Sequence, residues 1–234
     1  MELTVISDDK IGRKGLVAKH SLSILVVRNL ESYLFGMGID PGVLEHNSKE
    51  LGIGLDTVDY VVVSHEHTPH YGGYRYISAE APFTDVFIPY GASESLGRLF
   101  ARNGLKPREV RAWTQLSEGV YLSKPFYGPP YEHFMVFEHG KGLVVLSGCM
   151  HPGVTALSSI SEFLRKGIYA IVGGFHLANA PSTIVESYTK YLIDVVKPRL
   201  VIPLHCSGNE FVNKLRETGL VEVAELSTGD EFRM

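Results

Sequence analysis

The sequence predicts an α/β protein, classed as α+β by some schemes, in which two sheets are sandwiched between helices in four layers, αββα. Strand-like apolar runs dominate the first two thirds of the chain, and the last third alternates helical and strand-like segments. A chain that begins with strands and then alternates helices with strands is expected to form two sheets covered by helices. One large domain over residues 1–234 is the simplest expectation, because a chain of this length can bury a substantial core.

The first half of the chain is expected to contain several strands and three helices, one of them a short helix directly after Gly73. One helix is expected over residues 43–51 and ends at Gly52, which suits a left-handed C-terminal position. Another is expected over residues 93–103, with Ser93 as its N-cap and Gly104 after its end. The expected strands are residues 3–7, 22–28, 32–38, 59–63 and 85–89.

The second half begins with strands and ends in alternating units. The proline- and aromatic-rich segment 124–131 is either an ordered loop near the mouth of a site or a simple connector. A long helix with one apolar face begins near Pro181 and ends before Pro198. The expected strands are residues 110–113, 120–123, 132–138, 142–147, 168–172 and 200–204, with a hairpin joining 132–138 to 142–147.

One stretch, VVVSHEHTPHYGG over residues 61–73, has the histidine spacing of a metal site. His65 and His67 follow a buried strand, and their spacing of two points both rings to one side of an extended chain. A single histidine at a strand end is more often structural than a ligand. Here six of ten histidines follow apolar strands, and ligands of open metal sites commonly lie on such loops. The six are His65, His67, His70, His151, His176 and His205.

These segments together resemble the metallo-β-lactamase fold, in which a His-x-His-x-Asp-His motif follows a strand. More closely, they look like the subgroup of archaeal dihydropterin ribofuranosylaminobenzene phosphate synthases and related hydrolases. The resemblance is specific for the fold but not for the substrate, because this superfamily hosts many reactions. The segments are FGMGIDPG, HNSKELGI, VDYVVVSHEHTPHYGG, GLVVLSGCMHPG, VGGFHL and LHCSG.

The resemblance implies one or two metal sites. His65, His67 and His151 match the first site, and His70 and His205 match the second. Cys149 falls where many relatives place a bridging aspartate, so it is either a thiolate ligand or a small buried packing residue.

The resemblance also implies two residues that assist catalysis. Asp40 matches a strand-end aspartate that supports the histidine loop, although a helix-capping role is the alternative. His176 is expected in substrate binding or proton transfer rather than in a structural role. The other histidines are expected to be surface or packing residues, with His20 and His133 as candidate pocket contributors: His20, His46, His133 and His139.

Pro69 departs from the family pattern, because it stands where relatives have a metal-binding aspartate. Proline offers no donor atom to a metal, but it suits the first turn of a helix that has Thr68 as N-cap. Three possibilities stay open: the second site binds weakly, His176 or Glu66 substitutes as a ligand, or the protein works with one metal.

The expected chemistry is metal-assisted hydrolysis of a small-molecule substrate, such as a phosphoester, phosphodiester or related ester. A divalent ion held by imidazoles lowers the pKa of its water to about 7, which yields a bound hydroxide. Zinc suits such ligands best, with manganese, iron or nickel as alternatives. A dihydropterin-type synthase or transferase and a non-catalytic metal or ligand binder are the other hypotheses.

Composition limits the partners. The net charge of -4 disfavours nucleic acid as a partner, and no apolar run reaches the ~18 residues that cross a bilayer. The start of the sequence lacks the pattern of a signal peptide, so we expect a cytoplasmic protein without a membrane partner. Cys149 and Cys206 each lie within two residues of a histidine and are expected to be reduced thiols.

Overall fold

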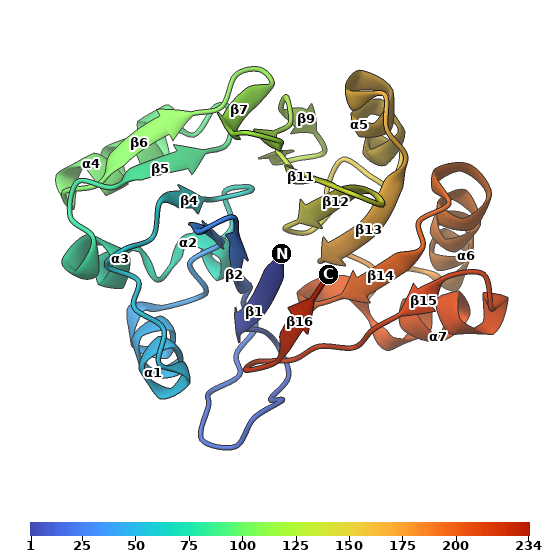
Figure 1. Cartoon of the computed structure of the whole chain (residues 1–234), viewed down its shortest axis with the longest axis horizontal. Coiled ribbons are helices and arrows are strands. Elements are labelled where there is room, and N and C mark those ends of the chain that lie inside the picture. Colours follow the sequence, from blue (N-terminus) through green and yellow to red (C-terminus); the bar gives the residue numbers. More distant parts are fainter. The chain divides into compact units, whose positions relative to one another are not determined.

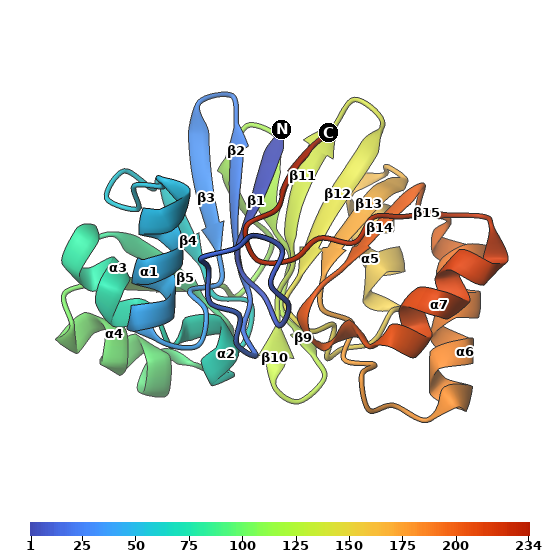
Figure 2. The same ribbon diagram turned by 90° about the horizontal axis from the view of Figure 1, so that it is seen from below.

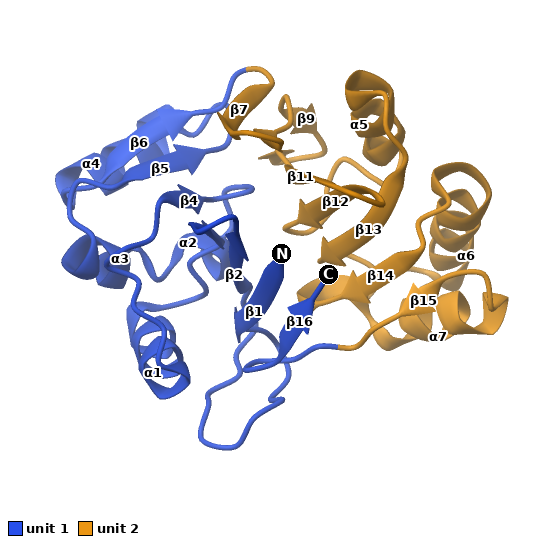
Figure 3. Ribbon diagram, in the orientation of Figure 1, with its two compact units in different colours: residues 1–111, 226–234 blue, residues 112–225 orange.

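The computed structural model describes residues 1–234, which form two compact units (Figures 1 and 3). Unit 1 comprises Met1–Arg111 and Leu226–Met234, and unit 2 comprises Ala112–Glu225. The chain therefore leaves unit 1 once and returns to it at its end. The expectation of one domain over residues 1–234 stays a prediction.

Unit 1 is built on a seven-stranded mixed sheet. Its strands are β1 (Glu2–Ser7), β2 (Ser23–Arg28), β3 (Glu31–Phe35), β4 (Tyr60–Val62), β5 (Asp85–Ile88), β6 (Lys106–Glu109) and β16 (Glu231–Arg233). They lie in the order β16-β1-β2-β3-β4-β5-β6, antiparallel from β16 to β3 and parallel from β3 to β6. The helices are α1 (Pro41–Leu51), α2 (Thr68–Tyr71), α3 (Tyr74–Glu80) and α4 (Arg98–Arg102), the last preceded by a π-helical turn at Ser93–Gly97.

Unit 2 is built on a second seven-stranded mixed sheet. Its strands are β7 (Thr114–Ser117), β8 (Val120–Leu122), β11 (Met135–His139), β12 (Gly142–Ser147), β13 (Ile168–Gly173), β14 (Leu200–Pro203) and β15 (Glu222–Val223). Their order is β15-β14-β13-β12-β11-β8-β7, parallel from β12 to β15 and antiparallel elsewhere. A separate hairpin joins β9 (Phe126–Tyr127) to β10 (Tyr131–Glu132). The helical segments are α5 (Ala156–Leu164), α6 (Ser182–Tyr191), a π-helical turn at Leu192–Val196, a 3₁₀ turn at His205–Ser207 and α7 (Asn209–Thr218).

In each unit the helices cover one face of that unit's sheet. Helices α1, α3 and α4 cover the sheet of unit 1, and α5, α6 and α7 cover that of unit 2 (Figures 1 and 2). Val61 and Val62 of β4 and Ile171 of β13 are fully buried, as expected for parallel strands whose apolar residues point to both faces. Burial of β4 holds the start of the histidine stretch rigidly.

The α/β class and most predicted strands are confirmed, but the predicted strand at 110–113 is wrong. Those residues connect β6 to β7, and the boundary between the two units falls between Arg111 and Ala112. β6 has the sequence KPRE and lies at the edge of its sheet. Edge strands commonly carry charges and proline, so β6 lacks the apolar signal of a strand.

Two other local predictions need correction. The helix predicted to start at the N-cap Ser93 begins instead with the π-helical turn, whose N-cap is Ala92 and has no side-chain hydrogen bond. Segment 124–131 is not a plain loop, because the short hairpin of β9 and β10 occupies much of it. None of the helices combines the length and apolar character needed to cross a membrane.

Candidate metal centre

In unit 1, three histidines converge immediately after β4. The ring centroid of His65 lies 4.1 Å from that of His70 and 4.8 Å from that of His67. His65 and His70 are buried, with exposed fractions of 0% and 1%, whereas His67 is exposed. Two buried rings and one exposed ring form a cluster that is open on one side, as a catalytic metal site requires.

One hydrogen bond orients the ring of His65. Its Nδ1 lies 3.0 Å from the hydroxyl oxygen of Ser64, within the buried part of unit 1. Metal-binding histidines commonly use one ring nitrogen for such an oxygen partner and the other for the metal. With Nδ1 engaged by Ser64, Nε2 is the nitrogen that a metal would take. The imidazoles of this loop therefore fit a divalent ion.

Pro69 has a structural role in the same loop. It lies in the first turn of α2, and its carbonyl accepts a hydrogen bond from the amide of Leu22 at 3.1 Å. The carbonyl of His70 accepts one from Met37 at 2.8 Å. The N-cap of α2 is His67 rather than the predicted Thr68. These contacts tie the loop to the ends of neighbouring strands without a carboxylate ligand.

Asp40 makes the contacts of a capping residue. Its carboxylate accepts from the amide of Val43 at 2.9 Å, at the start of α1, and pairs with Lys19 at 2.9 Å. Partial burial raises the pKa of Asp40, but the bond to Lys19 and the amide of Val43 together hold it below its ordinary value. The capping alternative is therefore observed, and the catalytic role stays a prediction.

In unit 2, a buried carboxylate holds the loop that carries Cys149 and His151. Glu132 Oε1 accepts hydrogen bonds from the amides of Gly148, Cys149 and Met150 at 3.0, 3.0 and 3.2 Å, and Oε2 accepts one from His151 at 2.8 Å. Glu132 is fully buried, and this burial raises its pKa against the lowering effect of the amides. These four hydrogen bonds fix the backbone of residues 148–151 relative to Glu132.

A second cluster in unit 2 joins Cys149, His176 and Cys206. One ligand atom from each residue lies within 4.8 Å of the other two. The amide of His176 also donates to the Cys206 sulfur at 3.2 Å. Hydrogen bonding from Cys149, helped by His176, lowers the pKa of Cys206 to about 4. Hydrogen bonding to Cys206 in turn raises the pKa of His176. The cluster therefore favours a thiolate at Cys206.

The other predicted ligands of unit 2 adjoin this cluster. The ring of His151 lies 4.5 Å from that of His176, and His205 directly precedes Cys206. Three non-glycine residues here have positive φ: Met150 (58°), His176 (55°) and His205 (50°). An L residue in this region costs roughly 1–2 kcal/mol, and such strain commonly occurs at functional sites.

The histidines without a predicted metal role have other surroundings. His20 pairs with Asp9 at 2.8 Å, His46 lies 2.7 Å from the Gly15 carbonyl, and His139 stacks on Tyr169. His133 is fully buried, and burial lowers its pKa to about 3, so its ring is neutral.

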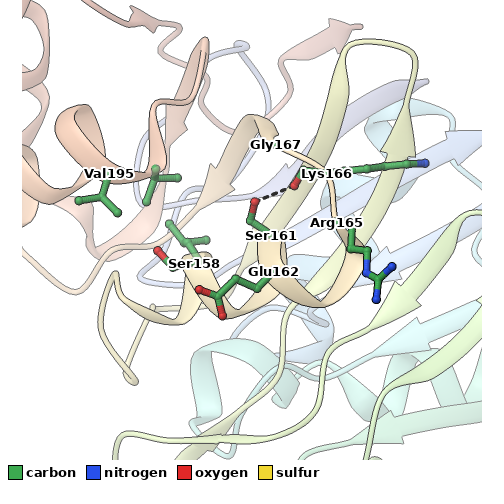
Figure 4. A pocket seen from close by; sticks show the side chains of 9 residues that line it. Ser158, Ser161, Glu162, Arg165, Lys166, Gly167 and Val195 are labelled. Atoms are coloured by element: carbon green, nitrogen blue, oxygen red, sulfur yellow. Dashed lines mark hydrogen bonds between the residues drawn. The ribbon is translucent and has the colours of Figure 1, made fainter.

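Unit 2 also has a surface pocket, which is lined by residues of the segments 157–167 and 195–196. Figure 4 shows Ser158, Ser161, Glu162 and Arg165 of its wall, with the Ser161 hydroxyl bonded to the Lys166 carbonyl at 2.7 Å. Its lining contains no histidine or cysteine. It therefore offers none of the ligands that the sequence predicts.

The family model of the metallo-beta-lactamase superfamily matches residues 35–160, more than half of the chain. The chain belongs to this superfamily. The match spans the three histidines of unit 1 and the loop of Cys149 and His151 in unit 2. Membership implies binding of a divalent metal, and the imidazoles and thiols described above are suitable donors.

Known proteins agree with this assignment to the metallo-beta-lactamase superfamily. The crystal structure of a metal-dependent hydrolase of the beta-lactamase superfamily matches with a TM-score of 0.86 at 23% identity, covering 100% of this chain and 99% of that one. A diphosphatase from the PhnP family matches with a TM-score of 0.62 at 12% identity, over 100% of this chain and 97% of that one. These likenesses confirm the predicted metallo-β-lactamase fold.

Sequence relatives of this superfamily member are archaeal. An uncharacterized protein of Methanocaldococcus jannaschii is 21% identical over 89% of this chain and 92% of its own length. The 7,8-dihydropterin-6-methyl-4-(beta-D-ribofuranosyl)-aminobenzene-5'-phosphate synthase of the same organism is 34% identical over 83 residues, 33% of this chain and 28% of that protein. This local similarity agrees with the predicted subgroup resemblance.

Sequence reasoning missed two residues of these clusters. Cys206 was expected only to be reduced, and Glu132 was not expected at a site at all. Each carried a signal, since Cys206 follows a predicted ligand and Glu132 is a carboxylate beside the apolar strand β11. The predicted ligands lie in two sets, one in each unit: His65, His67 and His70 in unit 1, and Cys149, His151 and His205 in unit 2. His176, predicted for substrate binding or proton transfer, also lies in unit 2.

Proposed function

We propose that this chain is a metal-dependent hydrolase that acts on a small phosphoester, phosphodiester or related ester. The observation that carries the proposal is the convergence of His65, His67 and His70 behind one buried strand, with ring centroids 4.1 and 4.8 Å apart. Superfamily membership supports the same reaction class. A divalent ion would supply Lewis acidity and lower the pKa of a water molecule to about 7.

The residues of unit 1 support this chemistry by orientation. Ser64 holds the ring of His65, and both residues are buried shortly after the end of β4. The exposed ring of His67 marks the side from which a substrate would enter. Zinc suits this imidazole set best, and Pro69 favours one ion over two at this loop because it contributes no donor atom.

Replacing His65 by alanine tests the proposal. We expect the affinity for zinc to fall at least about tenfold and hydrolysis of bis(4-nitrophenyl) phosphate to fall further, because a buried ligand is lost. Metal content by mass spectrometry after purification without added metal, together with initial rates, measures both effects. The diphosphatase among the fold neighbours makes a diphosphate the next substrate to assay.

His46→Ala is the matched control, since His46 is an exposed histidine of the same unit that lies beside a carbonyl. It should keep the metal content and rate of the unaltered chain. Less than a tenth of an equivalent of transition metal in the unaltered chain, under non-chelating conditions, would contradict the proposal. A dihydropterin-type synthase or a non-catalytic binder would instead bind metal but leave the esters intact.

A further inference from the structure

The two cysteines of unit 2 approach each other because glycine lies between their strands. A Cβ atom on Gly174 would stand 2.2 Å from the carbonyl oxygen of Gly148, 2.8 Å from the Cys206 sulfur and 3.2 Å from Cys149 Cα. Any larger residue would push the ends of β12, β13 and β14 apart. The close approach of Cys149 and Cys206 therefore depends on the absence of a side chain at Gly174.

The sulfur atoms are also held at defined positions. Glu132 clamps the backbone on both sides of Cys149, and the Cys206 carbonyl accepts hydrogen bonds from Leu177 and Ala178, both at 3.0 Å. Both thiols are buried, with exposed fractions of 3% for Cys149 and 8% for Cys206, and neither forms a disulfide. His176 is the third member of the cluster, and its side chain is exposed to solvent.

We propose that Cys149, Cys206 and His176 form a thiolate-rich metal site within unit 2, selective for a soft ion such as zinc or cadmium. Three donor atoms no more than 4.8 Å apart leave a point within about 2.8 Å of all three, against ordinary Zn–S and Zn–N distances of about 2.3 and 2.1 Å. Side-chain shifts of several tenths of an ångström complete the coordination. Two sulfurs and one nitrogen are a donor set that thiophilic metals prefer.

This site would have an open coordination position. Its two sulfur ligands come from the buried side, and the exposed His176 leaves solvent access for a water molecule or a substrate atom. Three protein ligands plus an open fourth position are typical of catalytic rather than structural zinc sites. The assignment gives His176 a role as ligand in place of the predicted role in substrate binding or proton transfer.

Cobalt(II) titration of the reduced full-length chain tests the site, because cobalt–thiolate bonds absorb in the near ultraviolet. We expect a thiolate charge-transfer band, about half of it lost in Cys206→Ser, and an affinity for cadmium lowered at least about tenfold in the same variant. His176→Ala should keep the band and weaken binding. His139→Ala, which removes a histidine of unit 2 that stacks on Tyr169, is the matched control and should keep both the band and the cadmium affinity.

A second measurement needs no variant. Cadmium should protect both cysteines of the unaltered chain from iodoacetamide, as counted by mass spectrometry. Cobalt binding without a thiolate band, a band unchanged in Cys206→Ser, or alkylation that cadmium does not slow would each overturn the site. These outcomes are independent of ester hydrolysis, so failure of this site and failure of the proposed hydrolase can be told apart.

Discussion

Replacing Glu132 by alanine is expected to lower the free energy of unfolding by about 4 kcal/mol or more. The change removes the acceptor of four backbone amides, those of residues 148–151, in the interior of unit 2. Each buried donor left without a partner costs about 1–3 kcal/mol, and water that enters the space recovers only part of this. Urea unfolding of the metal-free chain measures the loss.

Two further variants test whether the loss of stability comes from the acceptor oxygens of Glu132. Glu132→Gln keeps one acceptor oxygen but places an NH₂ group against an amide, so we expect a smaller loss of about 1–3 kcal/mol. Glu162→Ala removes an exposed glutamate of α5 in the same unit and should leave the unfolding midpoint unchanged. If Glu132→Ala and Glu162→Ala unfolded at the same urea concentration, the hydrogen bonds of Glu132 would not contribute to the free energy of unfolding.

Replacing Pro69 by aspartate is expected to raise the affinity of the unit 1 loop for zinc at least about tenfold, or about 1.4 kcal/mol. The loop otherwise offers neutral imidazoles, and a carboxylate beside His70 adds an anionic oxygen ligand. Position 69 lies in the first turn of α2, where backbone amides have no helical partner, so aspartate is tolerated. Competition with a chromophoric chelator and metal content together measure the gain.

Pro69→Ala is the control for this gain. It removes the ring without adding a donor, and loss of the proline alone should destabilise the chain by only about 0.4–1 kcal/mol through the unfolded state. Zinc affinity in Pro69→Ala should match that of the unaltered chain. Equal zinc affinity in Pro69→Asp and Pro69→Ala would show that position 69 does not face a bound ion.

Much of the fold was predictable because its buried strands carry strong local signals. β4, β12 and β14 are apolar runs that end directly before histidine-bearing loops, so both the strands and the candidate ligands follow from the sequence pattern. The hairpin of β11 and β12 was likewise predicted, and its register pairs Met135 with Leu146. These elements depend on side chains within a few residues of one another.

The remaining features depend on contacts that sequence spacing does not show. The acceptor role of Glu132 requires a loop 16 to 19 residues later to fold back onto it. The pairing of Cys149 with Cys206 requires two parallel crossovers and the absence of a side chain at Gly174. β6 was missed because an edge strand needs little apolar surface. Long-range packing, rather than local propensity, determines each of these features.

The positive φ angles of Met150, His176 and His205 determine which substitutions at these positions would raise the folding stability. Together they represent a few kcal/mol that glycine would not require, at roughly 1–2 kcal/mol for each position. A chain improved for thermal resistance alone would accept glycine at positions 176 and 205 and lose two imidazoles, whereas Met150 would be kept because its side chain is buried in the core. At the ends of β12, β13 and β14, substitutions that raise the folding stability would therefore remove candidate ligands. Stabilising substitutions are best sought away from these strand ends.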